Sequence, residues 1–296
     1  MSIDGRSLVL VSLCSLWGSY LVHELWWREP PKPPEPLAAA AREVDDAPAA
    51  APLANDRGDV RDVSASSRLH CLADLYAGRV AERDGAPGLE LPDGDFVPYD
   101  DGLTKSAADR LDAPDLQDMF EEPYERGAHA IVTQPDFDPG RARVQKLFDA
   151  AYGATADSVN QRLVSVDILG MKVRFHERAA PALRAVAAEL QRLIGTERRP
   201  EALSALGGTF NWRAVASSER RSAHSHGIAL DLNPQAADYW RWTKTRAFRH
   251  PIPDRIVDAF ERHDFIWGGR WYHFDTMHFE YRPELFHPNC QPARSR

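Results

Sequence analysis

The chain has 296 residues, of which 43% are hydrophobic and 27% charged, and its formal net charge is -8. This length and composition suit one large or two modest globular domains with a substantial core. Because the chain is acidic and no basic run exceeds two residues, nucleic acid is disfavoured as a partner. We expect none.

The N-terminus carries an almost uncharged run from Ser7 to Val22, which continues weakly to a tryptophan pair. Its length approaches the roughly 20 residues that cross a bilayer, and tryptophan favours the membrane interface. Glu24 weakens the far end of this run, so a cleaved signal peptide and a buried soluble helix are the alternatives. We predict a signal anchor, or transmembrane segment, over residues 1–28.

Two segments of unusual composition follow the apolar run. Residues 29–63 are rich in proline and alanine and hold almost no large apolar side chain, which predicts an extended, disordered linker. Residues 64–129 combine a possible helix from Ser64 to Glu82 with an acidic, turn-rich stretch from Asp93 to Glu125. We interpret residues 64–129 as an acidic, partly helical arm.

The three cysteines are too few for a disulfide framework, and none lies in a Cys-x-x-Cys pair. Cys14 belongs to the apolar run. Cys71 and Cys290 could form one disulfide if the body of the protein is exported, or remain two unpaired thiols.

Residues 130–290 have the pattern of a compact α+β domain, with helices followed by mainly antiparallel strands. We expect a helix that Asp138 caps and Gly153 ends, a β-hairpin over Leu163–Phe175, and a helix over Ala180–Ile194. Short strands are predicted over residues 209–216, 227–232 and 271–281, with a helix from Pro253 to His263 between the last two.

Two short stretches hold the residues that carry chemistry, SAHSHGIALD from Ser222 and DTMHFE from Asp275. Histidine and carboxylate side chains at such spacing can build a zinc site with three protein ligands and an open position for water. In a strand, Asp231 points away from the core residues Ile228 and Leu230. His224 would point the wrong way in a continuous strand, so the chain must turn between His224 and Asp231, and the flexible glycine between them permits this.

We predict that His224, Asp231 and His278 bind the metal and that a carboxylate accepts a proton from the attacking water. Asp275 is the first candidate for this base and Glu280 the second. Asp275 can reach the face of His278 only if the chain bends or bulges between them.

Five further histidines are interpreted as surface or structural residues: His226, His250, His263, His287 and, with a possible role in orienting a carboxylate, His273. Arg213 could hold a substrate carboxylate or an oxyanion, or be an ordinary surface arginine. Four tryptophans are expected in the core and cleft wall: Trp240, Trp242, Trp267 and Trp271.

The two stretches resemble the signature of the D-alanyl-D-alanine carboxypeptidase-like zinc peptidases. Ser222 to Asp231 matches S-x-H-x-x-G-x-A-x-D, and Asp275-x-x-His278-Phe-Glu matches its second half. Further similarity lies in DPGR at Asp138, GTFNWR at Gly208, YWRW at Tyr239 and FIWGGRWYHFDTMHFEYRPEL at Phe265. The family includes vancomycin-resistance carboxypeptidases and L-alanyl-D-glutamate endopeptidases, and it shares its fold with the Hedgehog signalling domain.

The resemblance implies an α+β fold of antiparallel sheet and flanking helices, with Zn²⁺ on His224, Asp231 and His278. It also implies that Asp275 is the general base and that Arg213 assists the substrate carbonyl or carboxylate. The expected activity is removal of a terminal D-alanine from peptidoglycan stem peptides in the periplasm, by a protein anchored in the inner membrane. Aspartate at position 275 is similar to the endopeptidases, which leaves an endopeptidase as an alternative, and a silent zinc-bearing binding module is a third.

Overall fold

The computed structural model describes residues 64–127, 130–195, 197–215, 220–243 and 252–291. The predicted signal anchor and the proline-rich linker, residues 1–63, lie outside this part of the chain, as does His250. No helix within the described ranges is long and apolar enough to cross a membrane.

The first part of the described chain, residues 64–127, contains more regular structure than the predicted arm. Helix α2 (Ala65–Leu75) begins at Ser64, whose side chain accepts a hydrogen bond from Ser67 N. Three antiparallel strands follow in the order β1 (Arg79–Arg83), β2 (Ala86–Glu90) and β3 (Phe96–Pro98), and then helix α3 (Ala107–Asp112). The helix predicted from Ser64 to Glu82 ends at Leu75, and the strands were not predicted because they are short and lack a regular apolar alternation.

This first part is fastened to the C-terminal end of the chain. Cys71 and Cys290, whose pairing the sequence left open, form a disulfide across 219 residues of sequence. The hydroxyl of Tyr76 donates a hydrogen bond of 2.5 Å to Glu284, and that of Tyr124 donates one of 2.7 Å to Glu261. Residues 64–127 are therefore part of one folded body with the remainder.

The middle of the described chain follows the predicted pattern in most places. Helices α4 (Gln145–Tyr152), α5 (Ala156–Gln161) and α6 (Ala180–Ile194) flank the hairpin of β4 (Leu163–Ile168) and β5 (Met171–His176). The apolar stripe of α6 is buried, as expected.

The expected start of the first of these helices at Asp138 is wrong, because α4 begins seven residues later. The carboxylate of Asp138 binds His273 and Arg141 instead of capping a helix. Gly140 has a φ of 80°, and its carbonyl accepts a hydrogen bond from Arg282. These contacts hold the segment before α4 in an extended loop.

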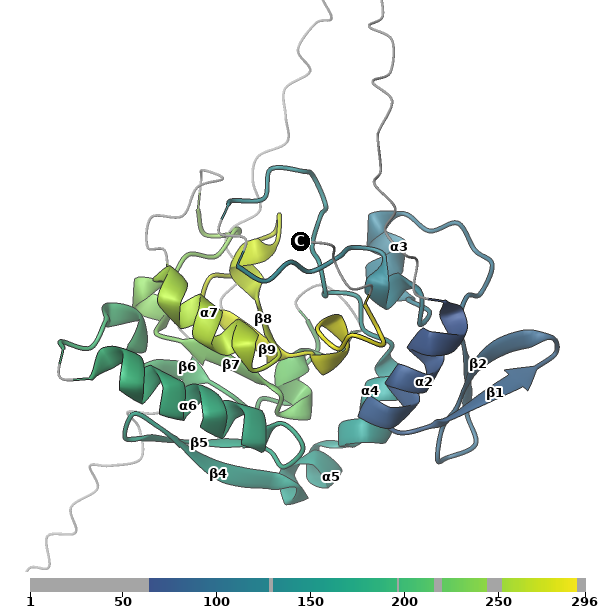
Figure 1. Ribbon diagram of the computed structural model, residues 1–296, viewed down its shortest axis with the longest axis horizontal. Helices are drawn as coiled ribbons and strands as arrows, with labels where there is room; N and C mark the ends of the chain where they lie inside the picture. Colours follow the sequence, from purple (N-terminus) through teal and green to yellow (C-terminus); the bar gives the residue numbers. More distant parts are fainter. Residues whose placement is uncertain (1–63, 128–129, 196, 216–219, 244–251, 292–296) are drawn as a thin grey trace, which may run out of the picture. The chain divides into compact units, whose positions relative to one another are not determined.

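A four-stranded antiparallel sheet forms the centre of the remaining chain. Its order is β6 (Leu206–Gly208), β7 (Ala229–Leu232), β9 (His278–Tyr281) and β8 (Phe265–Trp267). Helix α7 (Asp254–Arg262) lies beside α6 over the same side of this sheet (Figure 1). Phe260 of α7 stacks on Phe279 of β9 at 4.1 Å between ring centroids, which fixes the helix on the strand.

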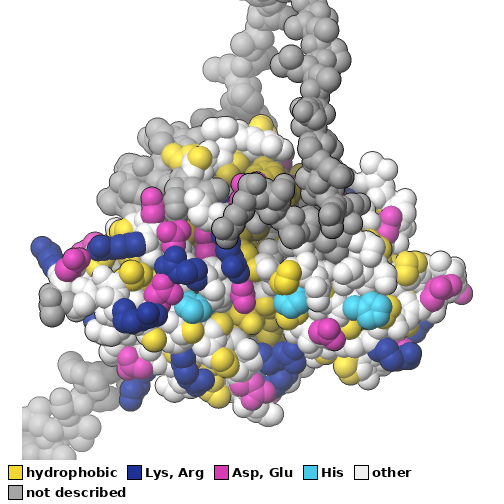
Figure 2. All heavy atoms as spheres, viewed as in Figure 1, with side chains coloured by type: hydrophobic (Ala, Val, Ile, Leu, Met, Phe, Trp, Pro, Cys, Tyr) yellow, Lys and Arg dark blue, Asp and Glu magenta, His cyan; other side chains and the backbone are white. Residues whose placement is uncertain are grey.

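The described residues also form six short 3-10 helices: η1 (Asp118–Phe120), η2 (Glu201–Leu203), η3 (Ala223–His226), η4 (Pro234–Ala236), η5 (Gly268–Arg270) and η6 (Pro283–Leu285). The α+β class with antiparallel sheets and flanking helices is confirmed. On the face drawn in Figure 2, cationic and acidic side chains are interspersed.

Candidate metal centre

The turn that carries His224 is built by its own sequence. Ser222 precedes η3, and its hydroxyl accepts a hydrogen bond from His224 N at 3.4 Å. Gly227 ends the turn with a φ of 65°, and a Cβ at this position would lie 2.5 Å from Leu163. The predicted turn between His224 and Asp231 is therefore present, and only glycine fits at its end.

The sheet brings the other two predicted ligands together. Strands β7 and β9 pair so that Asp231 lies opposite His278 and Ala229 lies opposite Glu280. Residues opposite each other in an antiparallel pair project from the same face. The neighbouring core residues Ile228 and Leu230 are fully buried, as the two-residue period predicted.

Three ligand atoms converge at this point. His224 Nε2 lies 3.2 Å from His278 Nδ1 and 3.2 Å from Asp231 Oδ1, and the last two atoms are 3.1 Å apart. Zinc bonds of about 2.0–2.2 Å in tetrahedral geometry place ligand atoms roughly 3.3 Å from one another. His224, Asp231 and His278 can thus hold a metal ion.

Each histidine is oriented by the ring nitrogen that faces away from this point. His224 Nδ1 lies 2.7 Å from the carbonyl oxygen of Thr209, which can only accept, so this nitrogen carries the proton. His278 Nε2 lies 3.3 Å from Glu280 Oε2. Such partners fix the tautomer that leaves the other nitrogen free to bind a metal.

Glu280 does not have the environment of a general base. It is fully buried, and both of its carboxylate oxygens bind Arg143 Nη1, at 2.9 and 3.1 Å. Although burial opposes the effect, the charge of Arg143 and the hydrogen bond of His278 hold the pKa of Glu280 well below its usual range. Its contact with His278 instead suits a residue that orients the imidazole ring. The only sign of this in the sequence is that Glu280 follows His278 by two residues, which places both on the same face of the strand.

Asp275, in contrast to Glu280, has the environment of a general base. A tight turn in which His278 N donates to Asp275 O at 3.2 Å provides the expected bend between the two residues. Burial and the charge of Asp231 raise the pKa of Asp275 to about 6. Its Oδ1 is buried and has no hydrogen-bond partner among the described residues, as suits a carboxylate that handles a proton.

Arg213 is placed next to the turn by its backbone. Its N–H donates to the Ser225 hydroxyl at 2.9 Å, and its carbonyl accepts from Ser222 N at 3.1 Å. These bonds join the Arg213 segment to Ser222 and Ser225, which lie on either side of His224 in the chain. The role of the Arg213 guanidinium remains a prediction.

The other histidines have structural partners, in agreement with the sequence interpretation. They are His226 with Asp149, His263 with Glu189, His273 with Asp138 and His287 with Cys71. Trp267 and Trp271 are buried, and the ring of Trp271 lies 5.5 Å from that of His278. Trp242 is about half exposed, so it is not the core residue that we expected.

Comparison with known proteins supports the resemblance seen in the sequence. Residues 216–281 match the D-alanyl-D-alanine carboxypeptidase family. No curated protein and no solved structure matches the chain. The family match includes His224, Asp231, Asp275 and His278, and it supports a metallopeptidase of this class.

Proposed function

We propose that this protein is a zinc-dependent D-alanyl-D-alanine carboxypeptidase that acts on peptidoglycan stem peptides. One observation carries the proposal. Three ligand atoms lie 3.1 to 3.2 Å apart on His224, Asp231 and His278. Asp275, whose pKa is raised by burial and by the charge of Asp231, has one buried oxygen without a hydrogen-bond partner among the described residues. A structural metal site needs no such carboxylate, whereas hydrolysis does.

A zinc ion held by these three residues would supply a Lewis acid that polarises the scissile carbonyl and makes water more acidic. Asp275 would accept the proton of the attacking water on Oδ1 and then deliver it to the amine that leaves. Glu280 and Thr209 keep the two imidazole rings in place throughout. Arg213 would hold the substrate carboxylate or the developing oxyanion.

The same site suits an L-alanyl-D-glutamate-type endopeptidase, because the metal and the base do not choose the bond that is cut. The Asp275 side chain, which follows Gly268-Gly269-Arg270-Trp271, is similar to that of the endopeptidases and favours this second candidate. A wall-binding module without turnover is disfavoured by the carboxylate next to the ligands.

We place the protein in the bacterial envelope, anchored in the inner membrane through residues 1–28 with the catalytic domain in the periplasm. The disulfide between Cys71 and Cys290 supports an exported domain, since disulfides persist in oxidising compartments. The linker over residues 29–63 would let the domain reach the wall.

Mass spectrometry of soluble stem peptides after incubation with the full-length, zinc-loaded protein tests the proposal. Loss of one terminal D-alanine is expected. Internal cleavage would support the endopeptidase instead. Intact peptides in the presence of about one bound zinc per chain would contradict both.

A further inference from the structure

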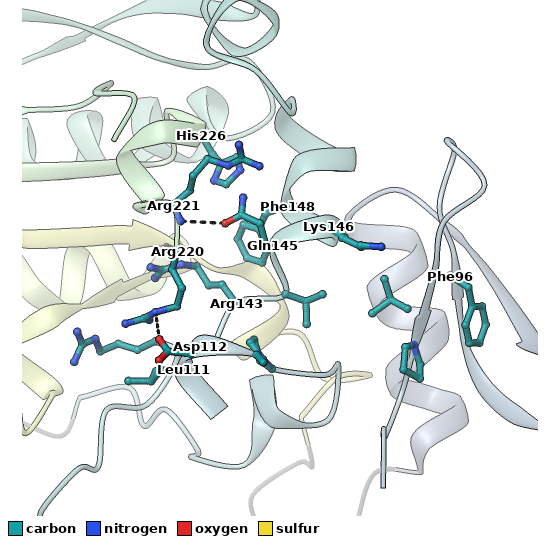
Figure 3. Close-up of a pocket in the computed structure, with 16 residues that line it drawn as sticks. Phe96, Leu111, Asp112, Arg143, Gln145, Lys146, Phe148, Arg220, Arg221 and His226 are labelled. Atoms are coloured by element: carbon teal, nitrogen blue, oxygen red, sulfur yellow. Dashed lines mark hydrogen bonds and ion pairs between the residues drawn. The ribbon is translucent and has the colours of Figure 1, made fainter. Parts of the chain in front are cut away.

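A cavity of about 460 Å³ lies between the first part of the chain and the part that carries the metal centre (Figure 3). Five cationic residues contribute to its lining: Arg141, Arg143, Lys146, Arg220 and Arg221. Among the lining residues only Asp112, the last residue of α3, carries a carboxylate. Apolar side chains also line it, among them Leu111, which lies beside Asp112, and Phe96 on the far side (Figure 3).

Two of the residues that line the cavity are linked to metal-binding residues. Arg143 binds both oxygens of Glu280, and Glu280 in turn holds His278. His226, which also lines the cavity, belongs to the same turn as His224. The cavity and the metal centre are therefore neighbours: both use residues of η3, and Arg143 is linked to His278 through Glu280.

Arg220 is the arginine in this cavity whose pairing is most easily exchanged. Arg141 binds Asp138, and Arg143 binds Glu280, both of which are carboxylates almost fully removed from water. The partner of Arg220 is Asp112, whose side chain is 66% exposed. Arg220 Nε lies 2.9 Å from Asp112 Oδ1, so the ion pair is formed with a carboxylate that is largely in contact with water.

The surroundings of Arg220 also favour a further negative charge. Its side chain is only 19% exposed, and burial followed by the charges of Arg143 and Arg141 lowers the pKa of Arg220. Figure 3 shows Arg220 and Arg143 on the same side of the cavity, whereas Lys146 points away from them. A planar carboxylate placed before these guanidinium groups would reduce their mutual repulsion and accept paired hydrogen bonds.

We infer that this cavity binds a carboxylate of the peptide substrate remote from the scissile bond, with Arg220 exchanging Asp112 for the substrate carboxylate. Apolar residues of the lining would contact the aliphatic part of the same side chain. The inference rests on the proposed peptidase function, and it assigns to Arg220 a role in choosing acidic peptides. Asp112 would act as a competing internal carboxylate.

Two peptides test this assignment, a soluble stem pentapeptide and the same peptide with its side-chain carboxylates amidated. For the zinc-loaded protein, Arg220→Gln should raise KM for the acidic peptide roughly tenfold or more, with little change in kcat or in KM for the amidated peptide. Asp112→Asn should lower KM for the acidic peptide by about twofold to fivefold, because an exposed competitor is removed. Lys146→Gln, which removes a cation at the exposed rim, is the matched control and should change KM less than about twofold.

The opposite signs distinguish substrate binding from a structural ion pair. If Arg220 and Asp112 only stabilise the fold, the two variants lose the same contact, and KM should move in the same direction in both. That result, or equal KM of the wild-type protein for both peptides, would overturn the inference. Thermal melting of each variant checks folding, and Arg220→Lys keeps the charge without the fork if Arg220→Gln is unstable.

Calorimetric titration of both peptides into the same proteins separates this inference from the proposed function. If the wild-type protein cleaves neither peptide, the peptidase proposal fails. Preferential binding of the acidic peptide, weakened by Arg220→Gln, would still support the cavity. Equal binding of both peptides would refute it.

Discussion

The buried charged groups at the two ends of strand β9 differ in how completely they are paired. Arg282, directly after the strand, is fully buried. Its guanidinium donates to four acceptors: the carboxylates of Glu280 and Glu284 and the carbonyls of Gly140 and Ala142. Charge and hydrogen bonds are satisfied there by the chain itself, which is the pattern of a structural network.

The first residue of the strand, His278, lies in a different environment. Two carboxylates, Asp231 and Asp275, stand near two imidazole rings, and one oxygen of Asp275 has no hydrogen-bond partner among the described residues. Carboxylate and imidazole groups that converge in this way are suited to an added cation. The comparison predicts that substitutions near Arg282 reduce stability, whereas substitutions near His278 abolish activity.

The largest effect is expected for Asp275→Asn, which keeps the shape of the side chain but removes the base. We expect kcat to fall by roughly 100- to 10,000-fold, while zinc content and melting temperature stay close to those of the wild type. Peptide hydrolysis and metal analysis of the same preparation measure both. Unchanged kcat with zinc bound would show that another group accepts the proton.

The pH dependence of the wild type sharpens the same prediction. Burial and Asp231 raise the pKa of Asp275 to about 6, and a bound cation would lower this value. A base is active when deprotonated, so activity should rise with pH through the pKa of Asp275 and be half-maximal below about pH 6 when the cation is bound. His224→Ala is the control, since it should lose both zinc and activity.

A second prediction concerns the other end of the strand. Arg282→Met removes a fully buried cation, so Glu284 loses its guanidinium partner and Glu280 loses one of its two. Breaking such a network costs about 3 to 5 kcal/mol of the free energy of unfolding. Chemical denaturation measures this loss. Because Glu280 retains Arg143 and His278, the folded fraction should still bind zinc; loss of zinc at full stability would contradict the division between the two ends.

The third prediction tests whether the first part of the chain stabilises the whole body. Cys71→Ser, or reduction of the disulfide, removes a covalent link between residues that are 219 positions apart in the sequence. The expected decrease in the free energy of unfolding is roughly 2 to 5 kcal/mol. Denaturation with and without reductant measures it, and the serine variant should no longer respond to reductant. An unchanged stability in the variant would mean that the hydrogen bonds of Tyr76 and Tyr124 suffice.

The same contrast explains what the sequence could predict. Local rules predict the turn at Gly227 and the face of its strand on which Asp231 lies, but not the pairing of β7 with β9 that brings Asp231 opposite His278. The hairpin β4–β5 and helix α6 likewise follow from local patterns of apolar residues. These features needed no knowledge of distant contacts.

Features that depend on contacts between distant residues were missed. The loop before α4 is held by Arg282 and His273, more than 130 residues away in the sequence, so its helix-like start at Asp138 was misleading. The contact of Glu280 with Arg143, 137 residues away, is of this kind, and no spacing within a short window reports it. Strands β1 and β2 are different: they pair locally around Asp84-Gly85, a dipeptide typical of hairpin turns, so here a local signal was overlooked.

The smallest predicted effect concerns His176, a buried histidine that lies behind the ligand-bearing turn. Its backbone N–H donates to Gly227 O at 2.8 Å. The ring is satisfied in the neutral form, since Nε2 donates to Tyr152 O at 3.0 Å and Nδ1 accepts from Arg178 N at 3.2 Å. Burial and the charge of Arg162 lower the pKa of His176 to about 4.

Between pH 6.5 and 4, His176 is therefore protonated in the unfolded chain but neutral in the folded protein. Stability from this group is complete above pH 6.5 and decreases as the pH falls through that window. His176→Gln should remove this part of the pH dependence. The difference in free energy of unfolding between variant and wild type should thus shift in favour of the variant by at most about 2 kcal/mol from pH 7 to pH 5. If the difference in free energy of unfolding stays constant over this range, the folded protein accepts protonated His176. The structure around His176 and Gly227 would then be less rigid than its hydrogen bonds indicate.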